Sequence, residues 1–251
     1  MLVKYRVWQK GLPPRPIKLQ IPGWAGDHHR HDDGATPQPW HCIPFVEGST
    51  YGLELIYPFD AECHVTNENG QIKFQGDFSK ECTWSDPPSP PFAAFAPTHF
   101  GYTSAVDIEV PDEYVVRLEP HPRFYTDVTG TCPCAVPGHI HPWWSRIFFV
   151  VFKSPLPGQT IIFRKSEPYA QILVVPKRVN YEIKEMSQEE AAERKQTESV
   201  IDHNRKDICN HAWTDHRGNQ FDDKYKQLQS LFNKGGKAAI QKLVKKLQAK
   251  N

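Results

Sequence analysis

The densest group of potential metal ligands in this sequence lies between residues 132 and 141. His139 and His141 are two residues apart, and on a β-strand this spacing places both imidazoles on one face. Because imidazole binds iron, zinc, copper and nickel, the pair predicts one bound metal ion. Cys132 and Cys134 could complete a zinc site, although structural zinc usually takes its two ligand pairs from distant segments.

A second group of ligands lies upstream, in a run rich in histidine and aspartate. His31 and Asp33 have the His-x-Asp spacing that, with a distant histidine, forms the two-histidine, one-carboxylate iron(II) site. His139 or His141 would be that distant ligand. Arg164, on an expected late strand, would then bind the carboxylate of an oxoacid co-substrate through two parallel hydrogen bonds. A polar, solvated loop is the alternative for the upstream run.

A third candidate is His121, which has a proline on either side. Pro120 and Pro122 favour an extended backbone around it. A rigid histidine beside Arg123 and Asp127 suits binding or acid–base catalysis, because histidine titrates near neutral pH. The alternative is a structural loop in which His121 and Arg123 satisfy backbone carbonyls.

The paired histidines resemble the beginning of the metal-binding motif of the cupins, which are jelly-roll metal proteins. That motif continues with a glutamate a few residues later, whereas residues 142–146 contain no carboxylate. The resemblance is therefore limited to the geometry of the two histidines.

The sequence predicts that mainly short β-strands position these residues. Residues 104–110 alternate between apolar and polar side chains, and the apolar run 146–153 predicts a central strand. Residues 62–67 and 71–75 predict a hairpin around an Asn-Gly turn. The 23 prolines break the chain into short elements with long loops, as in the irregular segment 21–50. The expectation for residues 1–186 is an antiparallel sandwich or jelly-roll-like barrel, in a mainly β protein.

From Ser187 onward, the sequence pattern is typical of α-helices. Ser187 and Glu190 form a capping box, which predicts a helix to about residue 207. Residues 221–232 and 237–250 predict two more helices, so residues 187–251 form a C-terminal helical extension. The last helix has one apolar face and an opposite face rich in lysine. That second face is either solvated or docks on an acidic partner or surface.

The amino-acid composition and the absence of known motifs argue against several classes of function. The formal net charge of +1 predicts no overall electrostatic attraction to nucleic acid or to a membrane surface. No apolar stretch is long enough to be expected to cross a membrane. Six cysteines without a secreted spacing pattern, and no signal peptide, predict a soluble cytoplasmic protein with reduced thiols. The sequence lacks a phosphate-binding loop, a dinucleotide fingerprint and a nucleophile elbow.

Four further stretches carry a resemblance to an uncharacterised family of bacterial proteins. They are EPHPRF (119–124), VPGHI (136–140), FFVVFK (148–153) and EPYAQ (167–171). The resemblance spans about residues 40–190. It implies a bacterial or phage origin and a soluble protein, and it brings no activity and no assigned site.

The leading hypothesis is a metal-dependent enzyme with Fe(II) or Zn, most plausibly a jelly-roll, non-haem iron oxygenase and thus an oxidoreductase. It would act on a small molecule or peptide, with no nucleic-acid or membrane partner. One alternative is a non-catalytic ligand- or peptide-binding accessory module with an aromatic groove lined by Trp24, Trp40, Trp84, Trp143 and Trp144. Another is an assembly protein that oligomerises through its helical tail.

Overall fold

The computed structural model describes residues 1–18, 43–78, 81, 91–127, 129–214, 218 and 220–250. Contacts divide the chain into two compact units. The β unit comprises Met1–Ile21 and Glu47–Val179, and the helical unit comprises Pro22–Val46 and Asn180–Asn251. Among the described residues, none of the helices has the length and apolar character needed to cross a membrane.

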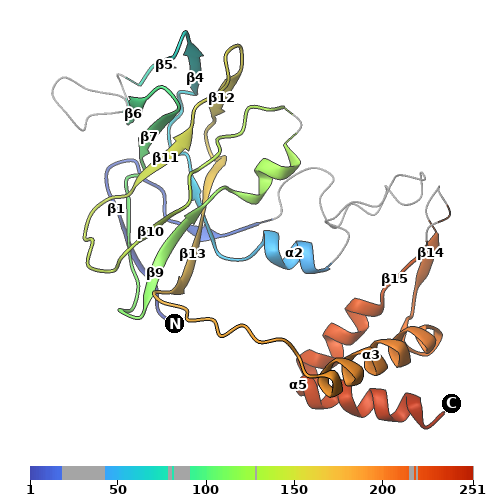
Figure 1. The fold of residues 1–251 in the computed structure, drawn as a ribbon. Coiled ribbons are helices and arrows are strands. Elements are labelled where there is room, and N and C mark those ends of the chain that lie inside the picture. The colour runs from blue at the N-terminus through green and yellow to red at the C-terminus, as the bar shows by residue number, and fades with distance from the viewer. Residues whose placement is uncertain are drawn as a thin grey trace. The chain divides into compact units, whose positions relative to one another are not determined.

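The β unit is built from short antiparallel strands (Figure 1). They are β1 Lys4–Val7, β2 Arg15–Pro16, β3 Leu53–Ile56, β4 Cys63–Glu68, β5 Gln71–Gln75, β6 Phe92–Ala96, β7 His99–Thr103, β8 Val106–Glu109, β9 Tyr114–Glu119, β10 Gly138–Ile140, β11 Phe149–Lys153, β12 Thr160–Phe163 and β13 Pro168–Pro176. A 3-10 turn, Pro122–Thr126, follows β9, and helix α2 spans Ile43–Ser49.

The largest sheet has the strand order β10-β9-β13-β3-β2, and the others are β11-β7-β6, β12-β4-β5 and the ribbon β1-β8. All pairings are antiparallel, and none of the sheets closes into a barrel within the described ranges. The predicted mainly β, antiparallel fold class with a helical C-terminal segment is thereby confirmed.

Aromatic side chains fill the core between these sheets. Tyr102 lies 4.9 Å from Phe92 and 5.0 Å from Tyr169, and Phe152 lies 5.3 Å from Phe100, measured between ring centroids. Large aromatic rings bury much apolar area each, so a chain with 39% hydrophobic residues still assembles a continuous core.

Local sequence signals account for several of these elements. Asn69 and Gly70 both have positive φ, at 53° and 81°, and form the two-residue turn between β4 and β5. The run 146–153 becomes β11, which starts at Phe149 and lies at the edge of its sheet rather than in the centre. Residues 134–136 then cover its open side through backbone hydrogen bonds and one bridge. Helix α2 within the segment 21–50 was not predicted; Pro44 in its first turn has the fixed φ that suits a helix start.

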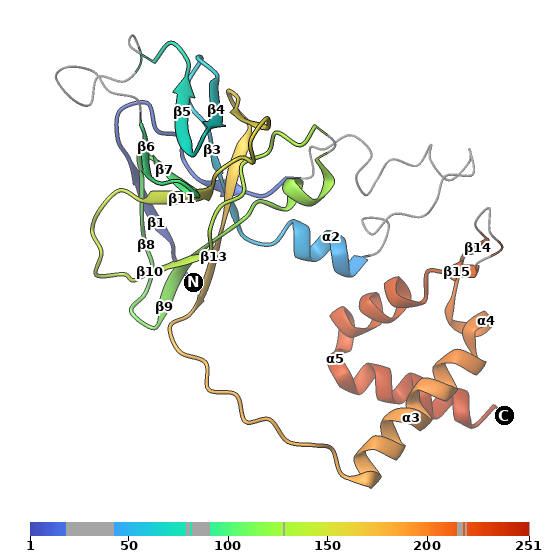
Figure 2. The ribbon, with the colours of Figure 1, turned by 45° about the horizontal axis from the view of Figure 1, so that its top comes forward.

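The helical unit contains α3 Gln188–His203, α4 Arg205–Ile208, the hairpin β14 Ala212–Thr214 with β15 Gln220–Asp222, and α5 Lys224–Gln248 (Figure 2). The capping box of Ser187 and Glu190 is present at the start of α3. The two predicted final helices form one element, α5, which bends where Gly235 and Gly236 leave helical geometry.

Gly52, which immediately precedes β3, has a φ of +96°. A Cβ atom at this position would press against the carbonyl oxygen of Ile172 in β13, so the close approach of the two strands depends on glycine. Gly158 has a similar φ of +81° but open space around it.

We expect Gly52→Ala to lower the free energy of unfolding by about 3 kcal/mol, because backbone strain and a steric clash combine. Gly158→Ala is the matched control and is expected to cost about 1 kcal/mol, from the left-handed backbone alone. Urea denaturation followed by fluorescence measures both. Equal losses would show that contact with Ile172 contributes nothing.

Candidate functional site

The structure separates His139 and His141. His139 lies on β10 opposite Arg117 of β9, with its side chain exposed, while Ile140 turns toward the core. His141 follows the end of the strand, where its ring stacks on Trp143 at 6.0 Å between centroids. Its Nδ1 is buried and has no hydrogen-bond partner in the described part of the chain. The same-face geometry of a continuous strand is therefore not formed.

The cysteines of this region do not complete a ligand set. Cys132 is a buried free thiol, and burial raises its pKa to about 11. Burial also raises the pKa of Cys134. Both thiols are therefore weaker acids than an exposed cysteine. His31 and Asp33 lie outside the described residues. Within the described ranges, no group of three or more His, Cys, Asp or Glu side chains could hold a metal ion.

His121 belongs to a buried charge network that includes a residue missed in the sequence. Glu54 of β3 is 1% exposed and accepts hydrogen bonds from Arg15 Nε at 2.6 Å and His121 Nε2 at 3.0 Å. His121 Nδ1 accepts from the backbone N–H of Arg123 at 3.1 Å. Both ring nitrogens are thus used in a neutral imidazole that carries its proton on Nε2.

Burial and hydrogen bonding act in opposite directions on this network. Burial raises the pKa of Glu54, but hydrogen bonds from His121 and Arg15 outweigh it and hold that pKa below its usual value. Burial lowers the pKa of His121, and the Glu54 carboxylate offsets only part of the effect. A glutamate between Leu53 and Leu55, in an otherwise apolar strand, was the available sequence signal, since a buried carboxylate requires partners.

Arg123 and Arg164 meet at a shared carboxylate. Arg123 Nη2 lies 3.1 Å from Glu167 Oε2, and Arg164 Nη1 lies 3.8 Å from the same atom. Arg164 Nε is also 3.6 Å from Glu62 Oε1. The charge of both guanidinium groups is therefore balanced within the protein, so Arg164 does not present the free fork that an oxoacid clamp requires.

The strongest concentration of charge lies in the helical unit. From Lys224 to Lys250 there are eight lysines and no aspartate, glutamate or arginine. Because the whole chain carries +1 and this segment +8, the remaining residues carry −7 in total. The lysines are Lys224, Lys226, Lys234, Lys237, Lys242, Lys245, Lys246 and Lys250.

Two of these lysines have carboxylate partners, Lys224 with Asp202 and Lys250 with Asp207. The other six are exposed, and none has a carboxylate within ion-pair distance on the described residues. Lys237, Lys242, Lys245 and Lys246 form what we call the lysine face of α5.

The opposite side of α5 is apolar and already in use. Val244 and Leu247 are buried, and Ile240 and Leu243 are half-buried. This stripe faces the rest of the helical unit, where α5 contacts α3 and α4 (Figure 2). Packing therefore fixes the helix so that its lysine face points to solvent.

Comparisons with known proteins add little to this geometry. No protein-family model and no curated protein matches the chain. The EIAV dUTPase structure aligns with 9% identity and a TM-score of 0.35, over 74% of this chain and 98% of that one. A mutant dUTPase from phage phi11 of S. aureus, described with a structural Mg(II) ion, aligns with 10% identity and a TM-score of 0.38, over 75% and 98%. A mutant dUTPase from Staphylococcus bacteriophage 80alpha, described with dUpNHpp, aligns with 10% identity and a TM-score of 0.35, over 74% of this chain and 97% of that one.

These findings correct the expected activity. The described residues provide no group of three or more metal-ligating side chains. The expectation of a non-haem iron oxygenase, and of oxidoreductase chemistry, was wrong. The physical reason is that the His139 side chain is exposed on β10, whereas His141 lies beyond the strand with its ring on Trp143 and its Nδ1 buried.

The expected partners were also wrong. The sequence predicted a small-molecule or peptide substrate and no nucleic acid. The exclusion of nucleic acid rested on the net charge of +1, which conceals the +8 of residues 224–250. The phi11 structure is described with a structural Mg(II) ion; for this chain, Fe(II) or Zn stays a prediction.

Removing the buried carboxylate should destabilise the β unit. We expect Glu54→Ala to lower the free energy of unfolding by about 3–5 kcal/mol, because it removes the carboxylate that accepts from Arg15 and leaves the His121 Nε2–H buried without that acceptor. Glu113→Ala is the control, since Glu113 is exposed, and should change stability by less than about 0.5 kcal/mol. Chemical denaturation measures both, and a loss below 1 kcal/mol in Glu54→Ala would contradict the role given to the network.

His121 also makes stability depend on pH. Since the pKa of His121 is lowered in the folded state, the unfolded chain binds the extra proton below about pH 6.5. The free energy of unfolding should therefore fall as the pH drops from neutral to 5. His121→Asn should flatten that slope relative to the wild type, whereas His139→Asn, at an exposed position, should retain it. A slope unchanged in His121→Asn would contradict this assignment.

Proposed function

We propose that this protein binds nucleic acid through the lysine face of α5, by contacts to phosphate groups. The observation that carries the proposal is the set of six exposed lysines without carboxylate partners in a segment that has no acidic residue. Lysines that neutralise phosphates release condensed counterions, and this release supplies most of the affinity in sequence-independent binding.

A membrane surface fits α5 less well. An interfacial helix inserts its apolar face into the lipid boundary. In α5 that face contains the buried Val244 and Leu247 and packs within the helical unit. Without an apolar anchor beside the lysine face, only its charges remain available for binding.

An acidic protein partner is also less well supported. Protein–protein interfaces favour arginine and aromatic residues and are depleted in lysine. The exposed charges of α5 are all lysines, and residues 224–250 contain no arginine. Point charges on flexible stems suit phosphates but provide little geometric recognition of a protein surface or a base edge. We therefore infer binding without sequence preference, with a dissociation constant in the range of about 1–100 μM at physiological salt.

Location and cofactor enter this proposal differently. A cytoplasmic location is compatible with it, since nucleic acid is present there, and Cys132, Cys134 and Cys209 are free thiols. Binding through lysine requires neither Fe(II) nor Zn.

The proposal is tested with the triple variant Lys242→Gln, Lys245→Gln, Lys246→Gln and a fluorescent duplex of mixed sequence, by anisotropy at several salt concentrations. The logarithmic salt slope should be about −4 for the wild type if the four lysines of the lysine face contact phosphates, and about −1 for the variant, in which Lys237 alone remains of that face. Affinity at low salt should fall on the order of tenfold or more.

The matched control is Lys18→Gln, Lys153→Gln, Lys177→Gln, which removes the same charge from exposed positions of the β unit. It should bind as the wild type does. Equal weakening in the two triple variants would assign the effect to net charge and overturn the lysine face. No duplex binding at low salt, or preferential binding to phosphatidylserine vesicles, would overturn the proposal itself.

A further inference from the structure

The exposed apolar side chains of the helical elements are of one kind. Among the described residues between 188 and 250, the large apolar side chains that are exposed are Trp213, Tyr225 and Phe232, and all three are aromatic. The large aliphatic side chains of the same segment, such as Leu228 and Leu231, are at least half-buried. Packing of aliphatic groups on a partner would not select rings in this way, so a partner that uses the flat faces of the rings fits better.

Tyr225 and Phe232 lie on one face of the first half of α5. Tyr225 is 52% exposed and Phe232 is 50% exposed. Seven residues separate them within regular helix, which places the two side chains within about 20° of each other around the axis and about 10 Å apart along it. Leu228 and Leu231, on the adjacent face, are half-buried, so the packing that covers them leaves the aromatic face in solvent.

The faces of these two rings are available to a ligand. Trp213 stacks on Phe221 with 6.1 Å between ring centroids, so one face of its indole is covered. Tyr225 and Phe232 make no ring or cation–π contact with any other described residue. Each ring can therefore accept a planar partner without displacing a neighbour.

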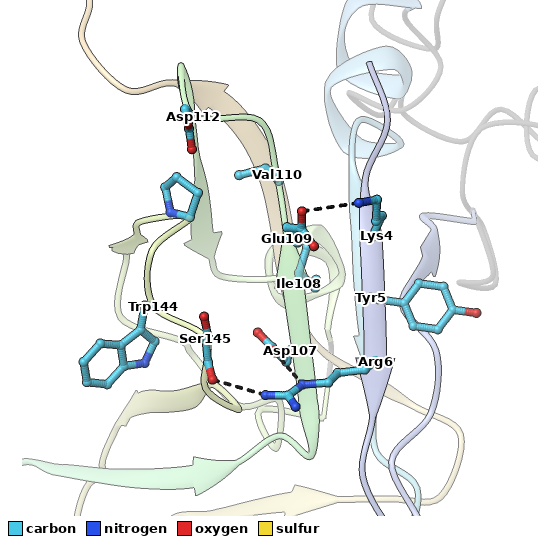
Figure 3. A pocket seen from close by; sticks show the side chains of 11 residues that line it. Lys4, Tyr5, Arg6, Asp107, Ile108, Glu109, Val110, Asp112, Trp144 and Ser145 are labelled. Atoms are coloured by element: carbon cyan, nitrogen blue, oxygen red, sulfur yellow. Dashed lines mark hydrogen bonds and ion pairs between the residues drawn. The ribbon is translucent and has the colours of Figure 1, made fainter.

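The groove of the β unit differs from this surface. It lies between the ribbon β1–β8 and residues 142–145, and Figure 3 shows the Trp144 indole directed away from β8. The Arg146 guanidinium lies 5.5 Å from the centroid of that indole, and Arg6 Nε lies 2.6 Å from Asp107 Oδ2. Ring and cation are thus both engaged within the β unit, whereas α5 offers both to a ligand.

Unpaired lysines adjoin the aromatic face. Lys226 follows Tyr225 directly, and Lys234 lies just before the bend of α5. Both are exposed, and neither has a carboxylate within ion-pair distance on the described residues. The lysine face begins at Lys237, directly after the bend. Rings that can stack on bases and cations that can contact phosphates therefore follow one another along a single helix.

We propose that α5 prefers single-stranded nucleic acid, whose bases stack on Tyr225 and Phe232 while the neighbouring lysines contact its phosphates; this inference rests on the proposed function. In a duplex the bases present only their edges in the grooves. A single strand can turn its bases outward onto aromatic rings. Stacking tolerates every base because each has a flat π face, which agrees with binding without sequence preference.

A lipid surface suits the two rings less well. A helix that lies in a membrane interface buries a continuous apolar face. Gln229 is four residues after Tyr225 and three before Phe232, so its polar side chain lies between the two rings on the same face of α5. Each ring is thus isolated, which stacking on a single base tolerates and insertion into lipid does not.

Fluorescence anisotropy of the full chain with labelled oligothymidine, and with a mixed-sequence duplex of the same length, tests the preference. The single strand should bind about tenfold more tightly or better. The double variant Tyr225→Leu, Phe232→Leu keeps apolar side chains but removes the rings. It should lose this advantage while binding the duplex within about twofold of the wild type. An abasic oligonucleotide, which has phosphates but no bases, should bind the wild type as weakly as oligothymidine binds the double variant.

The matched control is Phe95→Leu, Tyr125→Leu, which removes one exposed ring of each kind from the β unit and should bind every ligand as the wild type does. Leucine is a good helix former, so α5 should persist in the first variant, and circular dichroism verifies this. RNA and DNA share bases and phosphates, so oligouridine and an RNA duplex are titrated in parallel. The single-strand preference must appear with at least one of the two sugars.

Several results would overturn the stacking proposal. These are equal affinity for oligothymidine and the abasic oligonucleotide, equal losses in the two double variants, or a loss that is the same for single strand and duplex. Binding of phosphatidylserine vesicles that requires the two rings would assign them to lipid instead. In each case, weakening by the triple lysine variant would leave the proposed function standing, whereas no binding of either strand form at low salt would remove both.

Discussion

The Glu54 carboxylate is the constraint on which the β unit depends. It lies on β3 and accepts from Arg15 on β2 and from His121 after β9, so it joins three segments that are far apart in the sequence. A buried ion costs several kcal/mol to desolvate, and only this complete set of donors compensates for that cost. The position of β3 beside β13, and of the turn that follows β9, is therefore coupled to one charged group rather than to apolar contact alone.

The aromatic core complements this polar constraint. Hydrophobic contacts favour burial but specify position weakly, whereas hydrogen bonds to a single carboxylate allow one arrangement. Tyr57 combines both properties, since its ring packs in the core and its hydroxyl donates to the Ala61 carbonyl at 2.9 Å. The same principle explains the fate of the candidate catalytic groups: Arg123 and Arg164 are engaged by Glu167, and His121 by Glu54, so each stabilises the sandwich.

The two units differ in how charge is distributed. In the β unit, acidic and basic side chains form local pairs, as in the ribbon β1–β8. In the helical unit, α3 supplies many of the carboxylates and α5 only lysines, and just two ion pairs join lysines of α5 to carboxylates of the described residues. Surface lysines that remain unpaired after folding repel each other, and a polyanion relieves that repulsion. The separation of acidic and basic side chains into different helices, rather than the net charge of the chain, is therefore the informative property of this protein.

The sequence by itself determined the elements whose signals are local. The Asn69–Gly70 turn, the capping box at Ser187 and the strand periodicity of residues 104–110 all depend on neighbours a few residues apart, and each appears in the structure. Tertiary structure alone decided which distant side chains converge. The strand carrying His139 ends before His141, and Glu54 rather than a metal holds His121. Spacing along a chain specifies a face of an element, but a site requires several elements in register, and that register is set by packing over the whole domain.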